Sequence, residues 1–595
     1  MNVDDRPSNR LADQHSAYLR AHSHDPVNWR PWGAKAFKRA VKLDRPIFLS
    51  IGYESCHWCH VMQRESFQDP DISGFLNRQF VCVKVDRELR PDIDTLYQMY
   101  VGTVTGSGGW PLSAFLLPDG SPFFGGTYFP KTSPRPEMPG FGNVMASIMQ
   151  AWVLERDTAF KTGTEAIEFL REMRAASSAP IGPTEVAGGI EAIRPMLDPL
   201  NGGLGTAPKF PQTAVIDLLL TAYESDGADW QFEAARDWVR AIIRGGLFDH
   251  VGGGVFRYAT DSDWTIPHFE KMLPDQGLLL STLARIHRIE PAEEYRVAAR
   301  MTADMLARDL ADPNGGFFSS LDADTAGTEG TTYVWTIEEL AAALDEPQLE
   351  LARRHLGVVD EGIWHGRTNV LTRRGGRDHE ADEVDGVLRV LAVARALRAQ
   401  PPVIENNITA YNAQVARGLI EAGAAFEDAD MSSAGTSALD WLLGTAARGD
   451  EVVRSPEDGS VASLRFLEDH SAVVAACLSA IEFSGRDELL KRAAAIHARA
   501  IKLFSDDAGF VMSTGDTALP FSPIETADAP GPAAASVLAE NAVRLAQLTD
   551  TPGHTEIAER ATRQFGRTAS MAPHLAANAI RVALIAGQDG VRKST

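Results

Sequence analysis

Two cysteines separated by two residues, Cys56 and Cys59, are the residues of this sequence best suited to chemistry. A thiolate at the start of a helix is stabilised by the unpaired backbone amides and the helix dipole, which lower its pKa. Cys56 is therefore expected to be the attacking sulfur. Cys59, one turn into the helix, is expected to resolve the mixed disulfide that results. A protonated His57 or His60 would stabilise the thiolate further.

Three other interpretations of these cysteines stay open. The C-x-x-C-H spacing also occurs where haem is attached covalently, which requires export, and the polar segment 1–10 shows no signal peptide. The two cysteines and His60 would bind zinc if another histidine supplied the fourth ligand, the candidates being His15, His22 and His24. The dithiol would also be a structural relic if the fold now serves for binding. The leading expectation is a redox dithiol with no metal and no cofactor.

The segments around the cysteines predict a thioredoxin-like arrangement of α/β type. An apolar run over 45–52 has the length of a strand and precedes the cysteines, and a helical pattern follows over 59–77. The remaining order is a strand over 80–86, a helix over 91–104, a strand over 112–117 and a hairpin strand from 122.

A tryptophan–proline pair, Trp110–Pro111, lies just before the third of these strands. The thioredoxin fold carries a cis-proline loop at this place, opposite the dithiol. A cis bond before proline costs only ~0.5–1 kcal/mol, so it is accessible here. Pro111 is therefore expected to present its backbone to the redox partner.

The second half of the chain predicts an all-α domain. Roughly 400 residues with helical periodicity follow position 185, and helix-plus-loop units of ~30–35 residues give about twelve helices. Twelve helices suit an (α/α)6 barrel, with a solenoid of helix pairs as the alternative. No repeat of fixed period is present, which favours the barrel. The predicted domains are a thioredoxin-like domain over 1–165, a linker over 166–184 and the barrel over 185–590.

A second group of candidate site residues lies in the barrel half and suits sugar chemistry. Carboxylates act as acid and base on glycosidic bonds, and imidazoles shuttle protons in epimerisation. The candidates are Asp249, His250, His268 and Glu270, followed by Asp322, Asp324 and Glu329 in a later acidic loop. Equally, these groups would anchor loops. The acidic loop is no EF-hand, because Ala326 and Tyr333 occupy positions where calcium ligands are required.

Composition narrows the classes of function. Among 595 residues there are 57 Lys and Arg against 80 Asp and Glu, a net charge of −23. Such a charge argues against nucleic-acid binding and against docking on anionic membranes. No apolar run reaches the ~18 residues of a membrane span, so a cytoplasmic protein is expected. Four cysteines exclude a disulfide-built scaffold. The isolated Cys82 and Cys477 are expected in the core.

Motifs along most of the chain resemble those of the spermatogenesis-associated protein 20-like family. They lie at 18–33, 56–62, 108–111, 125–130, 207–211, 249–254, 267–273, 322–324 and 333–336. The resemblance implies a thioredoxin-like domain fused to a domain like the six-hairpin glycosidases, a redox role, and a link to carbohydrate-type folds. The chain departs from the family pattern in its helical half, at Pro274, Glu405, Asn406, Asn407, Tyr411 and Ala535.

The predicted function is thiol–disulfide exchange through Cys56 and Cys59, with a redox partner protein or a small thiol as the partner. One alternative is a carbohydrate-active barrel, a glycoside hydrolase or a sugar epimerase or isomerase, with a carbohydrate ligand. Another is a sugar- or protein-binding module without catalysis. Neither nucleic acid nor membrane is expected among the partners.

Overall fold

The structure is a computed structural model that describes residues 8–135, 138–457, 459, 463–549 and 553–594. Residues 1–7, part of the segment used above to argue against export, lie outside this description. The chain divides into two compact units. The sheet unit comprises Met1–Ala176, Val453–Phe466 and Asp506–Ile524, and the helical unit comprises Ser177–Val452, Leu467–Ser505 and Glu525–Thr595.

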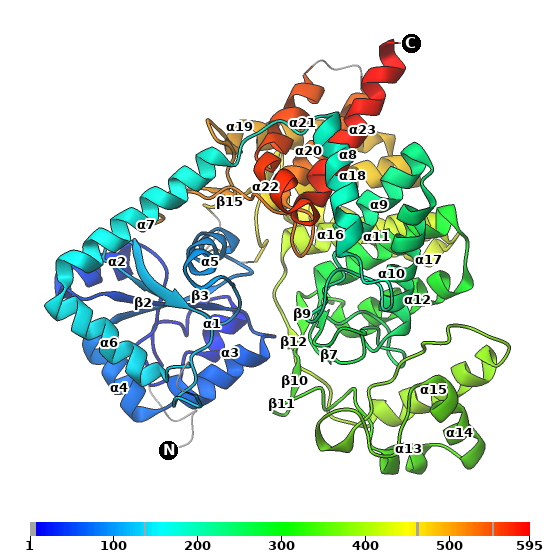
Figure 1. Ribbon diagram of the computed structural model, residues 1–595, viewed down its shortest axis with the longest axis horizontal. Coiled ribbons are helices and arrows are strands. Elements are labelled where there is room, and N and C mark those ends of the chain that lie inside the picture. The colour runs from blue at the N-terminus through cyan, green and yellow to red at the C-terminus, as the bar shows by residue number, and fades with distance from the viewer. Residues whose placement is uncertain (1–7, 136–137, 458, 460–462, 550–552, 595) are drawn as a thin grey trace. The chain divides into compact units, whose positions relative to one another are not determined.

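A five-stranded mixed sheet forms the centre of the sheet unit (Figure 1), and its strand order is β1-β3-β2-β4-β5. Strand β2 runs parallel to β3 and antiparallel to β4, which continues into the hairpin strand β5. The strands are β1 (Arg30–Pro31), β2 (Ile47–Gly52), β3 (Val81–Asp86), β4 (Leu112–Leu116) and β5 (Pro122–Gly126). The thioredoxin-like prediction is confirmed.

Helices cover both faces of this sheet. On one face Val83 and its neighbours pack against α2 (Ala34–Leu43), α5 (Pro91–Thr105) and α7 (Arg156–Ala176). On the other face Phe48 packs against rings that include Phe67 and Phe141. Phe67 ends a π-helical turn over Gln63–Phe67, and Phe141 begins α6 (Phe141–Leu154). The other helices that follow the cysteines are α3 (His57–Met62) and α4 (Pro70–Gln79).

Two segments from far along the chain complete the sheet unit. In the first, the buried Arg454 donates to the backbone oxygen of Glu88 over 2.8 Å. In the second, Asp516 accepts hydrogen bonds from Trp32, over 3.1 Å, and from Arg90. The sequence placed both segments in the barrel domain because they carry no strand or helix pattern of their own. The unit also extends past residue 165, since α7 continues to Ala176 through the first part of the expected linker.

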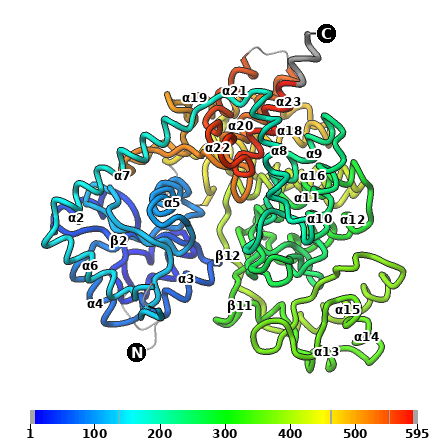
Figure 2. Tube along the Cα trace, in the orientation of Figure 1, coloured from blue at the N-terminus to red at the C-terminus, as the bar shows by residue number. Residues whose placement is uncertain are grey.

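Among the described residues of the helical unit, six inner helices pack side by side in a closed ring. The chain passes through them in the order α9 (Thr213–Asp226), α11 (Leu273–Ile289), α16 (Thr409–Ala425), α18 (Leu467–Ser484), α20 (Ala534–Leu548) and α23 (Ala577–Ser594). The last packs against the first, which closes the ring. The helices run from green to red in Figure 2.

Each inner helix packs against an outer helix next to it in the chain, which makes the predicted (α/α)6 barrel. The outer helices are α8 (Pro183–Ile193), α10 (Asp229–Arg244), α12 (Glu293–Met305), α17 (Ala429–Thr445), α19 (Leu490–Phe504) and α21 (His554–Arg563). The inner helix α18 is buried around almost its whole circumference, as expected for a helix enclosed by others.

An insertion between α12 and α16 was not predicted. It contains α13 (Ile337–Ala343), α14 (Glu346–His355) and α15 (Ala381–Ala396), which share a core around Trp335 and Leu391. Within the described part of the chain, no helix is long and apolar enough to cross a bilayer.

Replacing Asp516 by alanine should destabilise the sheet unit by about 1–3 kcal/mol, since Arg90 and Trp32 lose a largely buried partner. Asp440→Ala is the matched control, because its pair with Arg486 is exposed and should contribute under about 0.5 kcal/mol. Thermal unfolding of the full-length variants measures both. Equal shifts for the two variants would show that the distant segment does not stabilise the sheet unit.

Candidate functional site

The dithiol lies at the junction between the central strand β2 and helix α3. Cys56 is the N-cap residue of α3, and its sulfur accepts a hydrogen bond from the Cys59 amide over 3.2 Å. The two cysteines form a disulfide with their Cα atoms 5.3 Å apart. Cys56 keeps 4% of its surface exposed and Cys59 keeps 2%. Both cysteines are therefore buried in the disulfide form.

Pairing of β2 with β4 brings the proline loop to the same edge of the sheet. Ile51, near the end of β2, pairs with Leu112, the first residue of β4. The peptide bond between Trp110 and Pro111 is cis, as predicted. The Trp110 ring also lies 5.8 Å from that of Tyr53, which links the proline loop to the segment before Cys56.

Aromatic side chains flank the disulfide. Trp58, between the two cysteines, is 45% exposed, and its ring centroid lies 5.0 Å from that of Tyr128. The Tyr128 hydroxyl donates to Glu65 over 2.7 Å, which fixes its ring. The Arg87 guanidinium stacks over Trp110 at 4.1 Å. These groups form a surface that is suited to holding an extended peptide beside Cys56.

A cluster of buried polar groups lies beneath Cys59. A Cβ atom added at Gly52 would overlap the Tyr18 hydroxyl and lie 2.7 Å from the Cys59 sulfur, so both groups converge on this glycine. Lys84 is fully buried and donates to Ser50 over 3.2 Å. Burial lowers the pKa of Lys84 to about 7, although nearby carboxylates oppose the shift. Lys84 therefore titrates near neutral pH close to the dithiol.

The cluster also contains an acid and a histidine pair. Burial, reinforced by Glu88, raises the pKa of Asp86, whose carboxylate accepts a 2.6 Å hydrogen bond from Ser16. His22 and Asp25 form a buried pair 2.6 Å apart, and burial lowers the pKa of His22 to about 4. His22 is thus engaged with Asp25. Among the described residues, no three His, Cys, Asp or Glu side chains are arranged to hold a metal ion.

The sequence analysis missed Tyr18, Lys84 and Asp86 as site residues. The sequence does contain a sign that Lys84 and Asp86 belong to a site. Strand β3 alternates valines, at 81, 83 and 85, with Cys82, Lys84 and Asp86. Two charged groups on one face of a fully buried strand are expensive to bury, and such groups mark functional sites. Cys82 and Cys477 are buried, as predicted, and burial raises the pKa of each thiol, that of Cys477 to about 12.

The candidate residues of the helical unit fall into separate places. Asp249 is buried between Lys271 and Arg395, each 2.7 Å away. Burial would raise the pKa of Asp249, but the two cations outweigh it and hold the pKa well below its usual range. Asp249 is therefore a permanently ionised anchor. His250, in contrast, lines a cavity between α10, α12 and α15.

The structure brings His268, Glu270 and Glu329 together. His268 Nδ1 lies 2.9 Å from Glu329 Oε1. Burial disfavours the charged form of His268, but Glu329 and Glu270 outweigh it and raise the pKa of the imidazole. Arg257, which the sequence analysis missed, lies 3.4 Å from Glu270. The Tyr258 ring lies 5.1 Å from that of His268.

The acidic loop supplies the Glu329 of this group. Strands β10 (Asp324–Thr325) and β11 (Thr328–Glu329) form a hairpin in which Asp324 pairs with Glu329. Asp322 accepts a hydrogen bond from the Asp324 amide over 3.0 Å. The two aspartates therefore shape the hairpin that presents Glu329 to His268.

Comparison with known proteins finds a family model for the N-terminal part of the chain and relatives that align with more than nine-tenths of it. The family model described as a protein of unknown function, DUF255, with the model name Thioredox_DsbH, matches residues 8–171. Spermatogenesis-associated protein 20 of Mus musculus is 32% identical over 92% of this chain and 76% of its own. The protein of the same name from Homo sapiens is 32% identical over 93% of this chain and 77% of its own.

The chain belongs to the spermatogenesis-associated protein 20 family. Among solved structures, a cellobiose 2-epimerase from Bacillus thermoamylovorans is similar to this family member with a TM-score of 0.44. It is 10% identical and covers 64% of this chain and 85% of its own. A likeness at that level carries no argument about activity. The barrel is established here by the closed ring of helices.

Replacing Lys84 by methionine should remove a pH dependence of stability. Between about pH 7 and 10 the unfolded chain binds a proton that the folded Lys84 does not, so the stability of the wild type rises with pH in this window. From pH 7.5 to 9 the wild type should gain about 1.4 kcal/mol per pH unit relative to Lys84→Met.

Calorimetry of the full chain measures this difference. The unfolding transition of the sheet unit is recognised because it shifts when the Cys56–Cys59 disulfide is reduced. Lys161→Met, at an exposed site on α7, is the control and should follow the wild type. Parallel pH profiles for wild type and Lys84→Met would contradict a depressed pKa for Lys84.

Proposed function

We propose that this protein is a thiol–disulfide oxidoreductase that acts through Cys56 and Cys59. The observation that carries the proposal is a disulfide at a strand-to-helix junction, with cis-Pro111 at the same edge of the sheet. A redox partner protein or a small thiol completes the cycle, and a cytoplasmic location is part of the proposal.

The exchange follows from the order of the two sulfurs. In the reduced protein the Cys56 thiolate attacks a substrate disulfide, forms a mixed disulfide and releases one substrate thiol. Cys59 then loses its proton and attacks the Cys56 sulfur, which releases the second thiol and leaves the Cys56–Cys59 disulfide. Two electrons pass to the substrate, and a dithiol or two monothiols return them. The buried Tyr18 hydroxyl lies on the Cys59 side, where that proton is lost, and the Lys84 ammonium lies 4.8 Å from the Tyr18 ring.

Insulin reduction with dithiothreitol as electron donor tests this proposal. Cys56→Ser should abolish the stimulated rate, because no mixed disulfide can form. Cys59→Ser should instead accumulate a stable mixed disulfide with glutathione, detected by mass spectrometry. Cys82→Ser, which removes a buried cysteine of the same sheet, is the control and should keep the activity. An inactive wild type, or full activity in Cys56→Ser, would refute the proposal.

A second candidate function is acid–base chemistry on a carbohydrate in the helical unit. It is favoured by the His268 imidazole, which lies beside the carboxylates of Glu270 and Glu329 and has a raised pKa because of them. The stacked rings of Phe210 and Tyr258 lie next to this group, 4.8 Å apart. An imidazole beside carboxylates supplies both an acid and a base, and aromatic faces pack on sugar rings.

A panel of mono- and disaccharides, followed by calorimetry and by product analysis, tests this candidate. Glu270→Gln should lower any turnover at least ~100-fold, since it removes a charge beside His268. Glu339→Gln, at the exposed start of α13, is the control and should leave turnover unchanged. Turnover that persists in Glu270→Gln, or no sugar binding by the wild type, would remove this candidate.

A further inference from the structure

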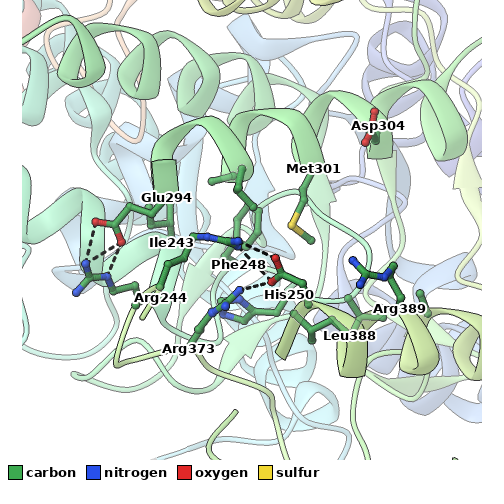
Figure 3. Close-up of a pocket in the computed structure, with 17 residues that line it drawn as sticks. Ile243, Arg244, Phe248, His250, Glu294, Met301, Asp304, Arg373, Leu388 and Arg389 are labelled. Atoms are coloured by element: carbon green, nitrogen blue, oxygen red, sulfur yellow. Dashed lines mark hydrogen bonds and ion pairs between the residues drawn. The ribbon is translucent and has the colours of Figure 1, made fainter. Parts of the chain in front are cut away.

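A cavity of about 400 Å³ lies between the barrel and the inserted helices (Figure 3) and has no role in the function proposed above. Its volume lies within the ~300–1,000 Å³ typical of small-molecule sites. Two helix faces form its walls. Helix α12 contributes residues 294, 297, 298 and 301, and α15 contributes 385, 388, 389 and 392. Residues three and four apart share one face of a helix, so the two faces point into the same space.

The middle of this cavity is apolar. Ile243, Phe248, Met301 and Leu388 line it, and Phe248 and Leu388 are buried within the protein. His250 also lines the cavity, and its Nε2 donates a hydrogen bond to the backbone oxygen of Gly245 over 2.9 Å. Burial lowers the pKa of His250 to about 4, so the ring is neutral at pH 7. A ligand here therefore meets apolar side chains and a neutral imidazole as well as the charged residues of the lining.

The rim of the cavity is rich in arginine. Glu294 is shared by Arg244, 2.7 Å away, and by Arg240, 2.9 Å away. Asp385 is likewise shared by Arg373 and Arg377, each 2.7 Å away. Each of these two carboxylates is therefore already paired with two guanidinium groups.

Arg389, on the other side of the cavity in Figure 3, forms no hydrogen bond or ion pair with any residue that the structure describes. The third acid of the lining, Asp304, is exposed and lies 3.4 Å from Arg300. An excess of guanidinium groups is unusual in a protein with a net charge of −23. Guanidinium groups bind carboxylates through paired hydrogen bonds, so this rim favours an anion.

We propose that this cavity is a binding site for a small amphipathic organic anion, a carboxylate with an aliphatic body. The aliphatic body lies on Phe248, Met301 and Leu388, and the carboxylate binds Arg389. This site is independent of the dithiol chemistry, because its lining contains no residue of the sheet unit.

Isothermal calorimetry with octanoate, and with 1-octanol as its uncharged counterpart, tests the proposal on the full chain. Octanoate should bind with one site per chain and at least tenfold more tightly than 1-octanol. Arg389→Gln should weaken octanoate binding about tenfold, the value of one charge-assisted hydrogen bond, and leave 1-octanol binding unchanged. Met301→Trp should abolish binding of both probes, because the indole fills the apolar part of the cavity.

Arg353→Gln is the matched control, since this exposed arginine of α14 is paired with Glu350 and Asp360 away from the cavity lining. It should bind octanoate as the wild type does. Arg389 is exposed, so Arg389→Gln is expected to fold, and its unfolding temperature verifies this. The proposal is overturned if the wild type shows no binding of octanoate at concentrations up to about 5 mM, which would already correspond to a very weak site. Equal affinity for the two probes, or undiminished octanoate binding in Arg389→Gln or Met301→Trp, overturns it as well.

Discussion

The pairing of β2 with β4 is the constraint on which the proposed chemistry depends. Hydrogen bonds between antiparallel strands fix which residues lie opposite each other, and a slip of one residue would turn every side chain to the other face. Here Ile51 pairs with Leu112, so the chain leaves β2 toward Cys56 at the edge where Pro111 leads into β4. The disulfide and the proline loop meet because of this register, although more than fifty residues separate them in sequence.

The register of β2 with its other neighbour, β3, places charge where the core would otherwise be apolar. Ser50 on β2 pairs with Lys84 on β3, which puts the ammonium group beneath the dithiol and among the rings of Tyr18, Trp29 and Phe67. Burying a lysine costs stability unless it is paired or neutral. A depressed pKa reduces that cost and gives the site a group that gains or loses a proton near pH 7. A group of this kind suits a reaction in which Cys59 must shed a proton.

Local patterns were sufficient to predict four of the five strands of the sheet, the cis-proline position and the ring of helices, but not the two-residue strand β1. Apolar runs such as 47–52 have only one compatible element length, and the helix count follows from length alone. Such patterns do not predict the contacts between distant segments that complete each unit. Arg454 and Asp516 belong to segments without periodicity, and only the folded chain shows that they stabilise the sheet unit. The insertion α13–α15, and with it the arginine-lined cavity, was missed for a different reason, because the sequence patterns of its helices do not differ from those of the barrel helices.

The path of the chain links the folding of the two units. The segment Val453–Phe466 leaves the barrel between α17 and α18, and Asp506–Ile524 leaves it between α19 and α20. During synthesis the first 176 residues therefore emerge long before the residues that satisfy Arg90, Trp32 and the backbone of Glu88. Domains generally fold in the order of their synthesis, but this sheet unit cannot reach its final set of contacts until residue 524 is available. Because those residues lie between barrel helices in the sequence, a chain cut at residue 176 would carry the cysteines without the contacts that complete their fold.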